Sequence, residues 1–529
     1  MDRAPIRWPL ALGLGVVVAV AVLGAILAGA GSSGPDGSGR SADPADPGST
    51  SLARPRAQVT IGGPVGRPIR AGFLGLSIEF PAVRSYTGPD PRRINPVLVQ
   101  LIRNITPDQS PVIRIGGDST DQAWVPTRGV TPPPQVSYGL TPRWFATTGA
   151  LATVLNAKLT MGLNLGANQP ALAAAEARRY ERSFKGALAA FEIGNEPNVY
   201  DVVAAYHTPS GGSVTTRPPG YGYPEYRREF NRVAAALPPL ALAGPALAAG
   251  PKPTKGSWIE TLPSFLTGER RVQTLTVHRY PLRNCFVGPG SPQYPTVSHL
   301  LASYATIGLD NSVRRYVAIA HSHGRELRVD ELNSVACRGK RGVSDTFASG
   351  LWVLDALFGL ARVGVDGVNM HTLPRSAYEL FKFSRAGGRW RASVPPVYYG
   401  LYMFARAALP GSRLLEVSGA RRGPRLSVWA TRAPDGQVRA VVINKSPLRR
   451  QTVTLRAPAG TGTTATVLRM QAPGVHARSG VTFGGASFGA ETYTGALPPP
   501  QIRSLTASRG SYSLSMPRAS AALLTFAGG

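Results

Sequence analysis

The chain has 529 residues, of which 43% are hydrophobic and only 16% are charged. This length and apolar content exclude intrinsic disorder of the whole chain and predict two or three folded domains. Basic residues outnumber acidic residues 58 to 29, so the formal net charge is +29. The basic residues are dispersed, with no run of lysine and arginine and no interleaved aromatic residues, which argues against nucleic acid as a partner. A dispersed basic surface and selection for an anionic ligand both remain compatible with this charge.

Residues 1–30 are predicted to be a signal peptide or a signal-anchor transmembrane helix. Arg3 and Arg7 precede an uncharged apolar segment, Leu10–Ala30, which is long enough to span a bilayer. The arginines are expected to stay in the cytoplasm, so the rest of the chain is expected outside it, either secreted or anchored by this segment alone. The sequence Ala28-Gly29-Ala30 suits cleavage, whereas the length of the apolar segment favours an anchor. Both alternatives stay open.

Residues 31–56 are rich in Gly, Ser, Pro and Asp and hold almost no large apolar side chain. Such a composition is typical of a disordered linker. The segment 57–71 that follows is strand-like. We expect it to add a strand to the domain at the C-terminal end of the chain.

Between residues 72 and 409, short apolar runs alternate with longer helical stretches. The expected strands are Gly72–Phe80, Val112–Gly116, Leu159–Leu165, Leu188–Gly194, Leu240–Gly244, Val272–His278, Glu326–Glu331 and Val365–His371. Helices are expected between and after them, for instance at Pro91–Ile105, Pro142–Ala157, Pro224–Ala236, Asp345–Val363 and Val397–Ala408. Eight strand-helix repeats predict an α/β fold of the (β/α)8 barrel type. The strands carry no glycine-rich phosphate-binding motif, which argues against a nucleotide-binding sheet.

Residues 410–529 show a different pattern, in which alternating apolar segments are separated by Gly and Pro turns. The clearest of these segments are Arg425–Ala430, Val438–Asn444, Thr452–Ala457, Thr464–Met470 and Ala521–Phe526. Alternation with a period of two is typical of half-buried strands. This part of the chain is therefore predicted to be an antiparallel β-sandwich.

Two glutamates lie at the ends of predicted barrel strands. Glu196 follows strand 4 in the run FEIGNEPN, and Glu331 ends strand 7 in the run RVDELNS. Active residues of such barrels lie at the C-terminal ends of the strands, and strands 4 and 7 are expected on opposite sides of the ring. Hydrolysis of a glycosidic bond with retention needs two carboxylates about 5–5.5 Å apart, one as nucleophile and one as acid and then base. The pair is therefore a candidate for this chemistry.

The residues before Glu196 suggest supporting roles. Asn195 is placed to hydrogen-bond a sugar 2-hydroxyl, a contact that strengthens in the transition state. Residues 192, 194 and 196 share one face of an extended strand, so Glu192 is expected either beneath Glu196, raising the pKa of that acid, or paired with an arginine. The sequence does not choose between these two arrangements.

For three residues near Glu331 the sequence predicts a role or a direction of the side chain. Tyr280, at the end of strand 6, could donate a hydrogen bond to Glu331 and hold it, or it could simply be a packed tyrosine. His278 is expected to be a hydrogen-bonding residue at the barrel lip rather than an acid or base. Asp330 alternates with Glu331 along the strand, so its side chain is expected to point away from the pocket.

Several ordered motifs together make the chain recognisable. FEIGNEPN and DELNSVAC are joined by IRIGGDSTD, VHRYP, VSDTFASGLWVLDAL, NMHTLPRSAY and VYYGLYMF. This set resembles the family-79 glycoside hydrolases, the group that includes β-glucuronidases and heparanase. The resemblance covers roughly residue 57 to the end. It implies that Glu196 is the general acid/base and Glu331 the nucleophile.

The resemblance also implies a sugar pocket. In the family, a tyrosine after strand 8 and the backbone amides of a glycine loop after the nucleophile hold the uronate carboxylate. His371 and Tyr378 match the spacing of the tyrosine site, whereas the loop departs from the pattern because Arg338 precedes Gly339 where a glycine is expected. Arg338 could pair with the carboxylate or point outward. Positions that contact sugar hydroxyls in the family are matched by Glu79 and Asp118.

Cys285 and Cys337 are the two cysteines of the chain, and they follow predicted strands 6 and 7. In an exported protein, such a pair in neighbouring loops predicts a disulfide, here on the rim of the pocket. The seven histidines are scattered without metal-ligand spacing. The predicted chemistry needs no metal and no cofactor.

The resulting hypothesis is an exported retaining β-glycosidase, most specifically a β-glucuronidase that removes terminal glucuronic acid from a glycan or glycoside. Within the enzyme class, the alternatives are a retaining β-glycosidase for neutral sugars and an endo-acting, heparanase-like enzyme. From another class, the alternative is a non-catalytic polysaccharide-binding protein of the cell surface, in which the β-domain and the basic surface would be the working parts.

Overall fold

The computed structural model describes residues 56–250, 258–419 and 425–528. The predicted signal or anchor segment and nearly all of the predicted linker lie outside these residues. Within the described residues, no helix is both long enough and apolar enough to cross a membrane.

Eight parallel strands close into a barrel, so the predicted fold class is confirmed. Around the ring they are β2 (Leu74–Ile78), β3 (Val112–Ile115), β6 (Lys158–Leu163), β7 (Leu188–Ile193), β10 (Leu242–Ala248), β11 (Val272–Arg279), β13 (Glu326–Leu332) and β15 (Gly367–Thr372). The two strands that precede the candidate glutamates, β7 and β13, are separated by β10 and β11 on one side and by four strands on the other. The two strands are therefore three positions apart around the ring and not directly opposite, as the sequence analysis expected, because β10 and β11 are the strands that separate them on the shorter side.

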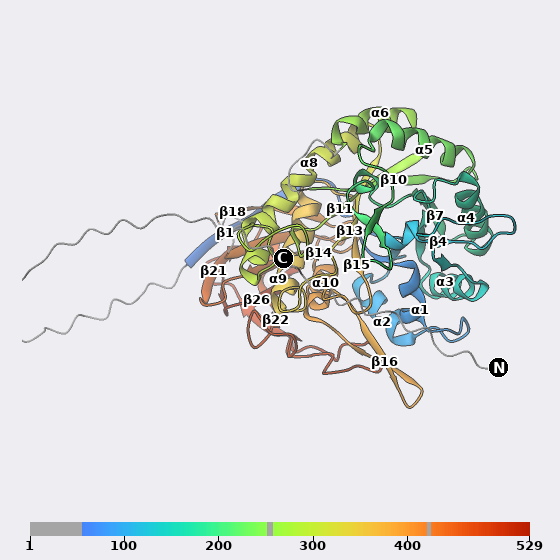
Figure 1. Ribbon diagram of the computed structural model, residues 1–529. Coiled ribbons are helices and arrows are strands. Elements are labelled where there is room, and N and C mark those ends of the chain that lie inside the picture. Colours follow the sequence, from blue (N-terminus) through green and yellow to red (C-terminus); the bar gives the residue numbers. More distant parts are fainter. Residues whose placement is uncertain (1–55, 251–257, 420–424, 529) are drawn as a thin grey trace, which may run out of the picture. The chain divides into compact units, whose positions relative to one another are not determined.

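Helices surround the barrel (Figure 1). They are α1 (Phe80–Thr87), α2 (Pro96–Ile105), α3 (Pro142–Leu155), α4 (Pro170–Ser183), α5 (Tyr223–Ala235), α6 (Leu262–Gly268), α7 (Val297–Leu301), α8 (Ile307–Ser322), α9 (Phe347–Arg362) and α10 (Pro396–Ala407). Their starts follow from the sequence. The Asn95 side chain accepts the N–H groups of Val97 and Leu98 at the start of α2, and Thr141 accepts that of Trp144 at the start of α3. In both helices proline occupies the first position, where no intrahelical N–H bond is lost.

The C-terminal strands form one ten-stranded sheet. It consists of β1 (Arg56–Val65), β18 (Arg413–Ser418), β19 (Leu426–Arg432), β20 (Val438–Asn444), β21 (Gln451–Arg456), β22 (Thr461–Gln471), β23 (Thr482–Phe483), β24 (Arg503–Thr506), β25 (Tyr512–Met516) and β26 (Ser520–Gly528). The sheet folds over on itself and brings β25, at one end of the strand order, next to β22, near the other end. There the Tyr512 hydroxyl on β25 donates to the Gly462 carbonyl on β22 at 2.6 Å. The apolar side chains between its two halves form a core of their own.

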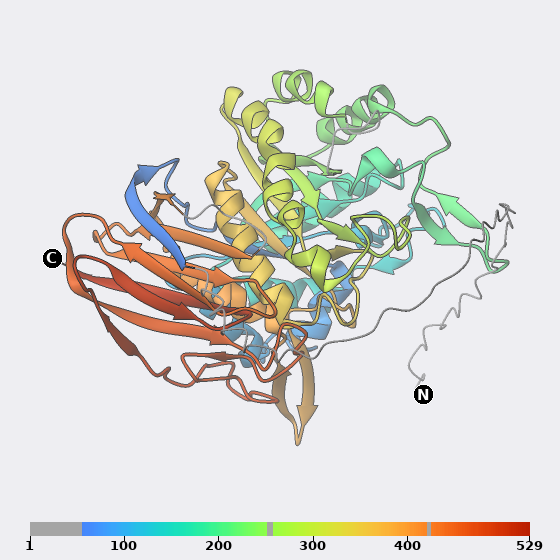
Figure 2. The ribbon, with the colours of Figure 1, turned by 90° about the vertical axis from the view of Figure 1, so that its left-hand side faces the viewer.

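Strand β1 connects the two ends of the chain. It pairs antiparallel with β18 and parallel with β21, so it lies inside the C-terminal sheet (Figure 2). The sandwich is therefore not purely antiparallel. Among the described strands of this sheet, the pairing of β1 with β21 is the exception to the antiparallel order.

Helices α9 and α10 lie between the barrel and this sheet. They approach closely at two glycines, since a Cβ atom on Gly400 would lie 2.3 Å from the Gly350 carbonyl oxygen. On the sheet side, the ring of Phe358 stacks on Trp429 at 5.6 Å. The barrel and the C-terminal sheet are thus joined by a packed helical layer.

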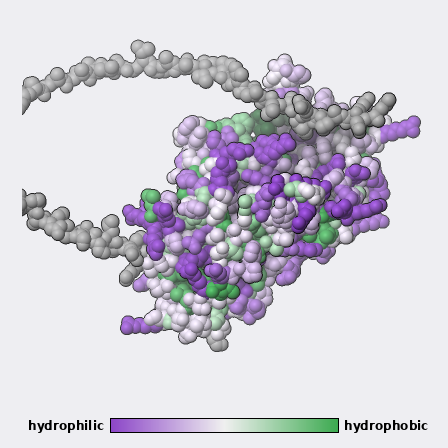
Figure 3. All heavy atoms as spheres, turned by 90° about the horizontal axis from the view of Figure 1, so that it is seen from below, coloured by the Kyte–Doolittle hydropathy of each residue, from purple (hydrophilic) through white to green (hydrophobic). Residues whose placement is uncertain are grey.

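Four short strand pairs extend from the barrel loops. They are β4 (Ala123–Trp124) with β5 (Tyr138–Gly139), β8 (Ala204–His207) with β9 (Ser213–Thr215), β12 (Leu282–Arg283) with β14 (Val335–Ala336), and β16 (Lys382–Ala386) with β17 (Arg389–Ser393). None of these four pairs was predicted, because strands of two to five residues carry little periodicity. On the face shown in Figure 3, hydrophilic residues occur at several separate places, which fits a dispersed distribution of charge.

Candidate active site

Several residues of the FEIGNEPN motif, at the end of β7 and in the loop after it, determine the position of Glu196. Gly194 has a positive φ of 80°, and a Cβ atom there would lie 2.7 Å from the Tyr200 hydroxyl. Glu196 itself is left-handed, with φ 51°, a conformation that costs a non-glycine residue on the order of 1–3 kcal/mol. Its N–H donates to the Ala246 carbonyl at 2.9 Å, and the Asn198 amide bonds the Ala248 backbone in both directions. The neighbouring strand β10 thereby holds the strained turn.

Glu331 lies on β13 and is held at both carboxylate oxygens. Oε1 accepts the Tyr280 hydroxyl at 2.7 Å, and Oε2 accepts an N–H of Arg114 at 3.0 Å. Burial raises the pKa of Glu331, but His371, His278, Arg114 and the Tyr280 hydrogen bond outweigh it and lower the pKa to about 2. Glu331 is therefore an ionised carboxylate at any pH near neutrality.

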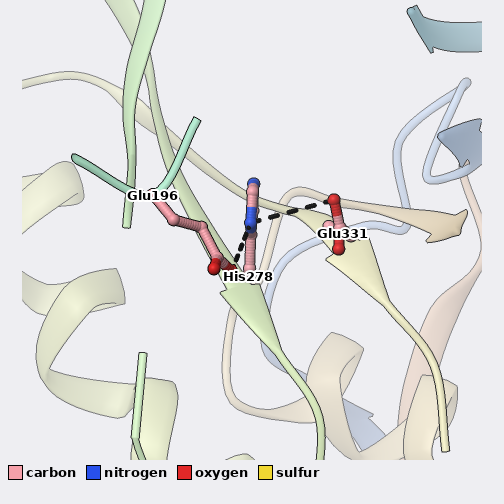
Figure 4. Close-up of side chains that lie close together, drawn as sticks. All are labelled: Glu196, His278 and Glu331. Atoms are coloured by element: carbon pink, nitrogen blue, oxygen red, sulfur yellow. Dashed lines mark hydrogen bonds and ion pairs between the residues drawn. The ribbon is translucent and has the colours of Figure 1, made fainter. Parts of the chain in front are cut away.

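His278 lies between the two glutamates (Figure 4). Its Nδ1 atom is 2.9 Å from Glu196 Oε1 and 3.8 Å from Glu331 Oε2. Burial lowers the pKa of His278, but the carboxylates of Glu331 and Asp330 outweigh this and raise the pKa well above its ordinary value. The ring is thus an imidazolium whose Nδ1–H donates to Glu196. This fits the hydrogen-bonding role expected for His278.

The two carboxylates are close to one another. Donor atoms of Glu196, His278 and Glu331 all lie within 4.8 Å of each other, and within the described ranges this is the single cluster of its kind. Because His278 Nδ1 is within hydrogen-bonding distance of Glu196, we interpret the cluster as a proton-transfer group. The Glu196 side chain is 26% exposed and that of Glu331 11%, so both reach the surface of the pocket.

Arg114 is a buried residue of the candidate site that the sequence analysis missed. Its guanidinium is fully buried and contacts Glu192 at 2.6 Å, Glu331 at 3.0 Å and the Asn195 side-chain oxygen at 3.0 Å. The signal was present in the sequence, since Arg114 stands between two isoleucines in a barrel strand. A charged side chain in such a strand requires a buried acidic partner.

Glu192 therefore takes the second of its two predicted arrangements, the pairing with an arginine. Its carboxyl contacts Arg114, and burial raises its pKa to about 8. The prediction for Asp330 is wrong. Its side chain is buried in the same cluster, 3.2 Å from Arg114 Nε, because a β-bulge in β13 interrupts the alternation.

The predicted sugar-contacting residues lie around the glutamates. The Asn195 oxygen is taken by Arg114, which turns its amide nitrogen toward Asp118 at 3.4 Å. Glu79 accepts the backbone N–H groups of Asp118 and Ser119, so its carboxylate caps the short 3-10 helix Asp118–Asp121. Gly117, with φ 96°, leaves room for this carboxylate, since a Cβ atom there would lie 2.3 Å from it.

His371 on β15 and Tyr378 in the loop after this strand lie near the glutamates. His371 Nδ1 is 3.6 Å from Glu331 and its Nε2 is 3.7 Å from Glu79. The Tyr378 ring lies 5.8 Å from His371 and 6.2 Å from Tyr280. Burial and the nearby carboxylates raise the pKa of Tyr378 well above its ordinary value, so its hydroxyl remains a donor.

The backbone of the loop after Glu331 has the left-handed conformation that glycine favours, although Arg338 occupies one of its positions. Cys337, Arg338 and Gly339 all have positive φ, at 61°, 67° and 77°. Gly339 packs against Tyr378, because a Cβ atom there would lie 3.0 Å from the Tyr378 backbone nitrogen. The Arg338 side chain is exposed, and its charge acts on Tyr378.

The predicted disulfide between Cys285 and Cys337 is confirmed, and it ties this loop to the one after β11. The short strands β12 and β14 bring the cysteines together through the pairs Leu282 with Val335 and Arg283 with Ala336. The disulfide thus holds the loop that contains Arg338 against the loop after β11.

The fold and the carboxylate pair define a class, the (β/α)8-barrel glycoside hydrolases with a C-terminal β-domain. Residues 428–523 match the model of the glycosyl hydrolase family 79 C-terminal beta domain. A curated β-glucuronidase of Aspergillus niger is 23% identical over 511 residues, which are 87% of this chain and 91% of that protein. A β-glucuronidase of Neurospora crassa is 24% identical over 341 residues, 58% of this chain and 57% of its own. These matches support family 79 and confirm the resemblance seen in the motifs.

Solved structures show the same fold. A 4-O-α-L-rhamnosyl-β-D-glucuronidase of Fusarium oxysporum superposes with a TM-score of 0.68 at 20% identity, covering 88% of this chain and all of that one. A family-51 arabinofuranosidase of Xanthomonas axonopodis pv. citri superposes with a TM-score of 0.62 at 14% identity, covering 89% and 99%. At these identities the likeness concerns the arrangement of barrel and β-domain.

Proposed function

We propose that the chain is a retaining β-glucuronidase. The observation that carries the proposal is the distance between carboxylate oxygens of Glu196 and Glu331, which is within 4.8 Å. Retaining glycosidases need about 5–5.5 Å between their two carboxyl groups, whereas inverting enzymes leave about 6.5–9.5 Å for a water molecule. A direct attack by one glutamate fits the shorter distance.

Glu331 acts as the nucleophile and Glu196 as the acid and then the base. In the first step, Glu331 attacks the anomeric carbon while Glu196 gives its proton to the departing oxygen, which leaves a glycosyl ester on Glu331. In the second step, Glu196 takes a proton from water, and the resulting hydroxide displaces Glu331. The low pKa of Glu331 supports this division, because a nucleophile must be ionised.

The sugar is held by residues at the C-terminal ends of six barrel strands, β2, β3, β7, β11, β13 and β15. Asn195 donates to the 2-hydroxyl, and Tyr280 keeps Glu331 in line with the anomeric carbon. The remaining binding residues are Glu79, Asp118, His371, Tyr378, Arg338 and Gly339. A uronate fits these residues, because Tyr378 offers a donor hydroxyl and the charge of the exposed Arg338 guanidinium acts on that same hydroxyl. The names of the two curated relatives support the same substrate.

We also propose that the enzyme acts outside the cytoplasm and that residues 1–30 direct its export, either as a cleaved signal or as an anchor. The confirmed disulfide supports this location, since disulfides persist in oxidising compartments. Cell fractionation followed by N-terminal sequencing separates the cleaved from the anchored form.

A panel of aryl β-glycosides assayed with the purified chain tests the substrate. We expect hydrolysis of the β-glucuronide and at least a hundredfold lower kcat/KM for the β-glucoside, about 3 kcal/mol of discrimination from an ion-paired carboxylate. Proton NMR of the first-formed sugar should show the β-anomer. Equal rates on both glycosides would favour the neutral-sugar alternative, and no hydrolysis of any member would favour the polysaccharide-binding alternative.

A further inference from the structure

Asp330 is an extra residue in its strand. In the pairing of β11 with β13, Val277 lies opposite Val329, but the next residue, His278, lies opposite Glu331. The pairing of β13 with β15 skips one residue over the same stretch. A bulge of this kind frees one side chain from the alternation of the strand and re-aims it. Here it turns a carboxylate into the barrel interior, where the Asp330 side chain is only 2% exposed.

This carboxylate lies behind His278. Its Oδ1 is 3.7 Å from His278 Nε2, and its Oδ2 is 3.2 Å from Arg114 Nε. The opposite ring nitrogen, Nδ1, faces Glu196 at 2.9 Å and Glu331 at 3.8 Å. The imidazole thus has a buried carboxylate on one side and both candidate catalytic carboxylates on the other.

We propose that Asp330 is a positioning residue that keeps His278 protonated throughout turnover, so that one imidazolium serves Glu196 and Glu331 in turn. The inference rests on the retaining mechanism proposed above. It assigns a role to a side chain whose inward direction the strand pattern did not predict.

The charges in the cluster show why a permanent counter-ion is useful. In the mechanism proposed above, the first step begins with Glu331 ionised and with the transferable proton on Glu196. After the first step, Glu331 is an uncharged ester and Glu196 is ionised, so one negative charge has moved from one side of His278 to the other. Asp330 takes no part in bond making, and its charge stays constant. It therefore stabilises the imidazolium in both states.

The other groups that face His278 do not replace Asp330. The cation Arg114 lowers the pKa of His278, and Glu192 is protonated near neutral pH because burial raises its pKa to about 8. Burial and the carboxylates of Glu79, Glu196 and Glu331 raise the pKa of Asp118 well above its ordinary value, which weakens it as a counter-ion. Among the described residues, the contacts within 4.0 Å of the buried nitrogen Nε2 include one carboxylate, and it belongs to Asp330.

The test compares two aspartate-to-asparagine variants. Asp330→Asn keeps the shape of the side chain and removes its charge. Asp366→Asn is the matched control, because Asp366 is also buried and pairs with a histidine, His321, at 2.8 Å, but near the start of β15. For Asp330→Asn we expect the alkaline limb of the kcat/KM profile to move down by about one pH unit or more, because the imidazolium of His278 is then lost at a lower pH. For Asp366→Asn we expect an unchanged profile.

Two further measurements separate positioning from structure. In a His278→Gln background, Asp330→Asn should leave the profile unchanged, since it acts through His278. NMR of ¹³C-labelled histidine, with His278 assigned by the His278→Gln variant, should show the ring protonated above pH 7 in the unmodified enzyme and its pKa lowered by about one unit or more in Asp330→Asn. This signal requires no substrate, so it remains readable if the chain hydrolyses no glucuronide.

Three results would overturn the proposal. The first is a neutral His278 at pH 7 in the unmodified enzyme, which can be measured even if Asp330→Asn does not fold. The second is a pH profile that moves equally in both asparagine variants. The third is a full shift by Asp330→Asn when His278 is already replaced.

Discussion

Two buried ion clusters in this chain contrast in composition. The cluster of Asp355 joins α9 to the C-terminal sheet, where the carboxylate accepts hydrogen bonds from Lys445 at 2.6 Å, Trp429 at 2.9 Å and Ser427 at 3.0 Å. In these three contacts the anion meets one cation and two neutral donors. The cluster of Arg114, beneath the pocket, brings one guanidinium against Glu192, Asp330 and Glu331.

The two clusters differ in the number of carboxylates that face one buried cation, and this difference separates a structural ion pair from a group of residues suited to proton transfer. A buried carboxylate with one cation and satisfied oxygens has a single stable charge state. Three carboxylates around one arginine cannot all be ionised at ordinary cost, so their pKa values separate, and that of Glu331 is lowered while that of Glu192 is raised. The first cluster fixes domains together, and the second prepares groups for proton transfer.

The strongest test of the Arg114 cluster is Glu331→Gln. We expect kcat to fall by on the order of 10⁴ or more, because the amide cannot form the glycosyl ester. The fold should persist, since the amide oxygen still accepts from Tyr280. Steady-state kinetics and circular dichroism measure the two effects. Undiminished hydrolysis would remove Glu331 from the nucleophile role.

Glu196→Ala should lower kcat by about 10²–10⁴ on a glycoside with a poor leaving group. Azide is expected to restore part of the rate on an activated aryl glycoside and to yield a β-glycosyl azide, because the small anion can enter the space left by the carboxylate. Product NMR identifies the azide. An unchanged rate, together with no azide product, would contradict the acid/base assignment.

The Asp355 cluster should respond in stability alone. Asp355→Asn leaves the buried Lys445 without its carboxylate, and breaking such a pair costs about 3–5 kcal/mol. Urea unfolding should show this loss, while kcat of the folded fraction stays unchanged. If kcat fell with little change in stability, the contrast between the clusters would be wrong.

Glu192 makes stability depend on pH. Its folded pKa of about 8 lies above the ordinary value of 4.5, so the folded state holds this proton more tightly. The stabilisation is complete below about pH 4.5 and is lost as the pH rises toward 8. Glu192→Gln should therefore flatten the decline in unfolding free energy between pH 5 and 8. An unaltered slope in urea titrations at several pH values would contradict this assignment.

Arg338→Ala should have the smallest effect, because Arg338 lies outside both clusters and is exposed. We expect KM for an aryl glucuronide to rise about tenfold, the loss of one exposed charge-assisted contact, with little change in kcat. Exposed Arg341→Ala, in the same loop, is the control. An equal rise in KM for a neutral aryl glucoside would show that Arg338 does not read the carboxylate.

Much of the barrel was predictable from sequence. The eight apolar runs predict its strands to within a few residues, because each run is bounded by turn residues and followed by a helical stretch. The positions of Glu196 and Glu331 follow from the same pattern, since strand ends meet at one face of a barrel. The two strands that separate β7 from β13, and so bring His278 between the glutamates, follow from strand order once the barrel is accepted.

What the sequence by itself determined is the fold class, the pair of glutamates and the cysteine pair, because these depend on local periodicity and on spacing along the chain. Only the tertiary structure decided the partners of Glu192, the inward direction of Asp330 and the role of Arg114. A β-bulge changes the direction of a side chain and leaves no mark in the sequence pattern. The acidic partners of the buried Arg114 lie on strands that are 78 or more residues away along the chain. The net charge of +29 does not predict these ion pairs, because the charges that form the candidate site are the few that the barrel buries.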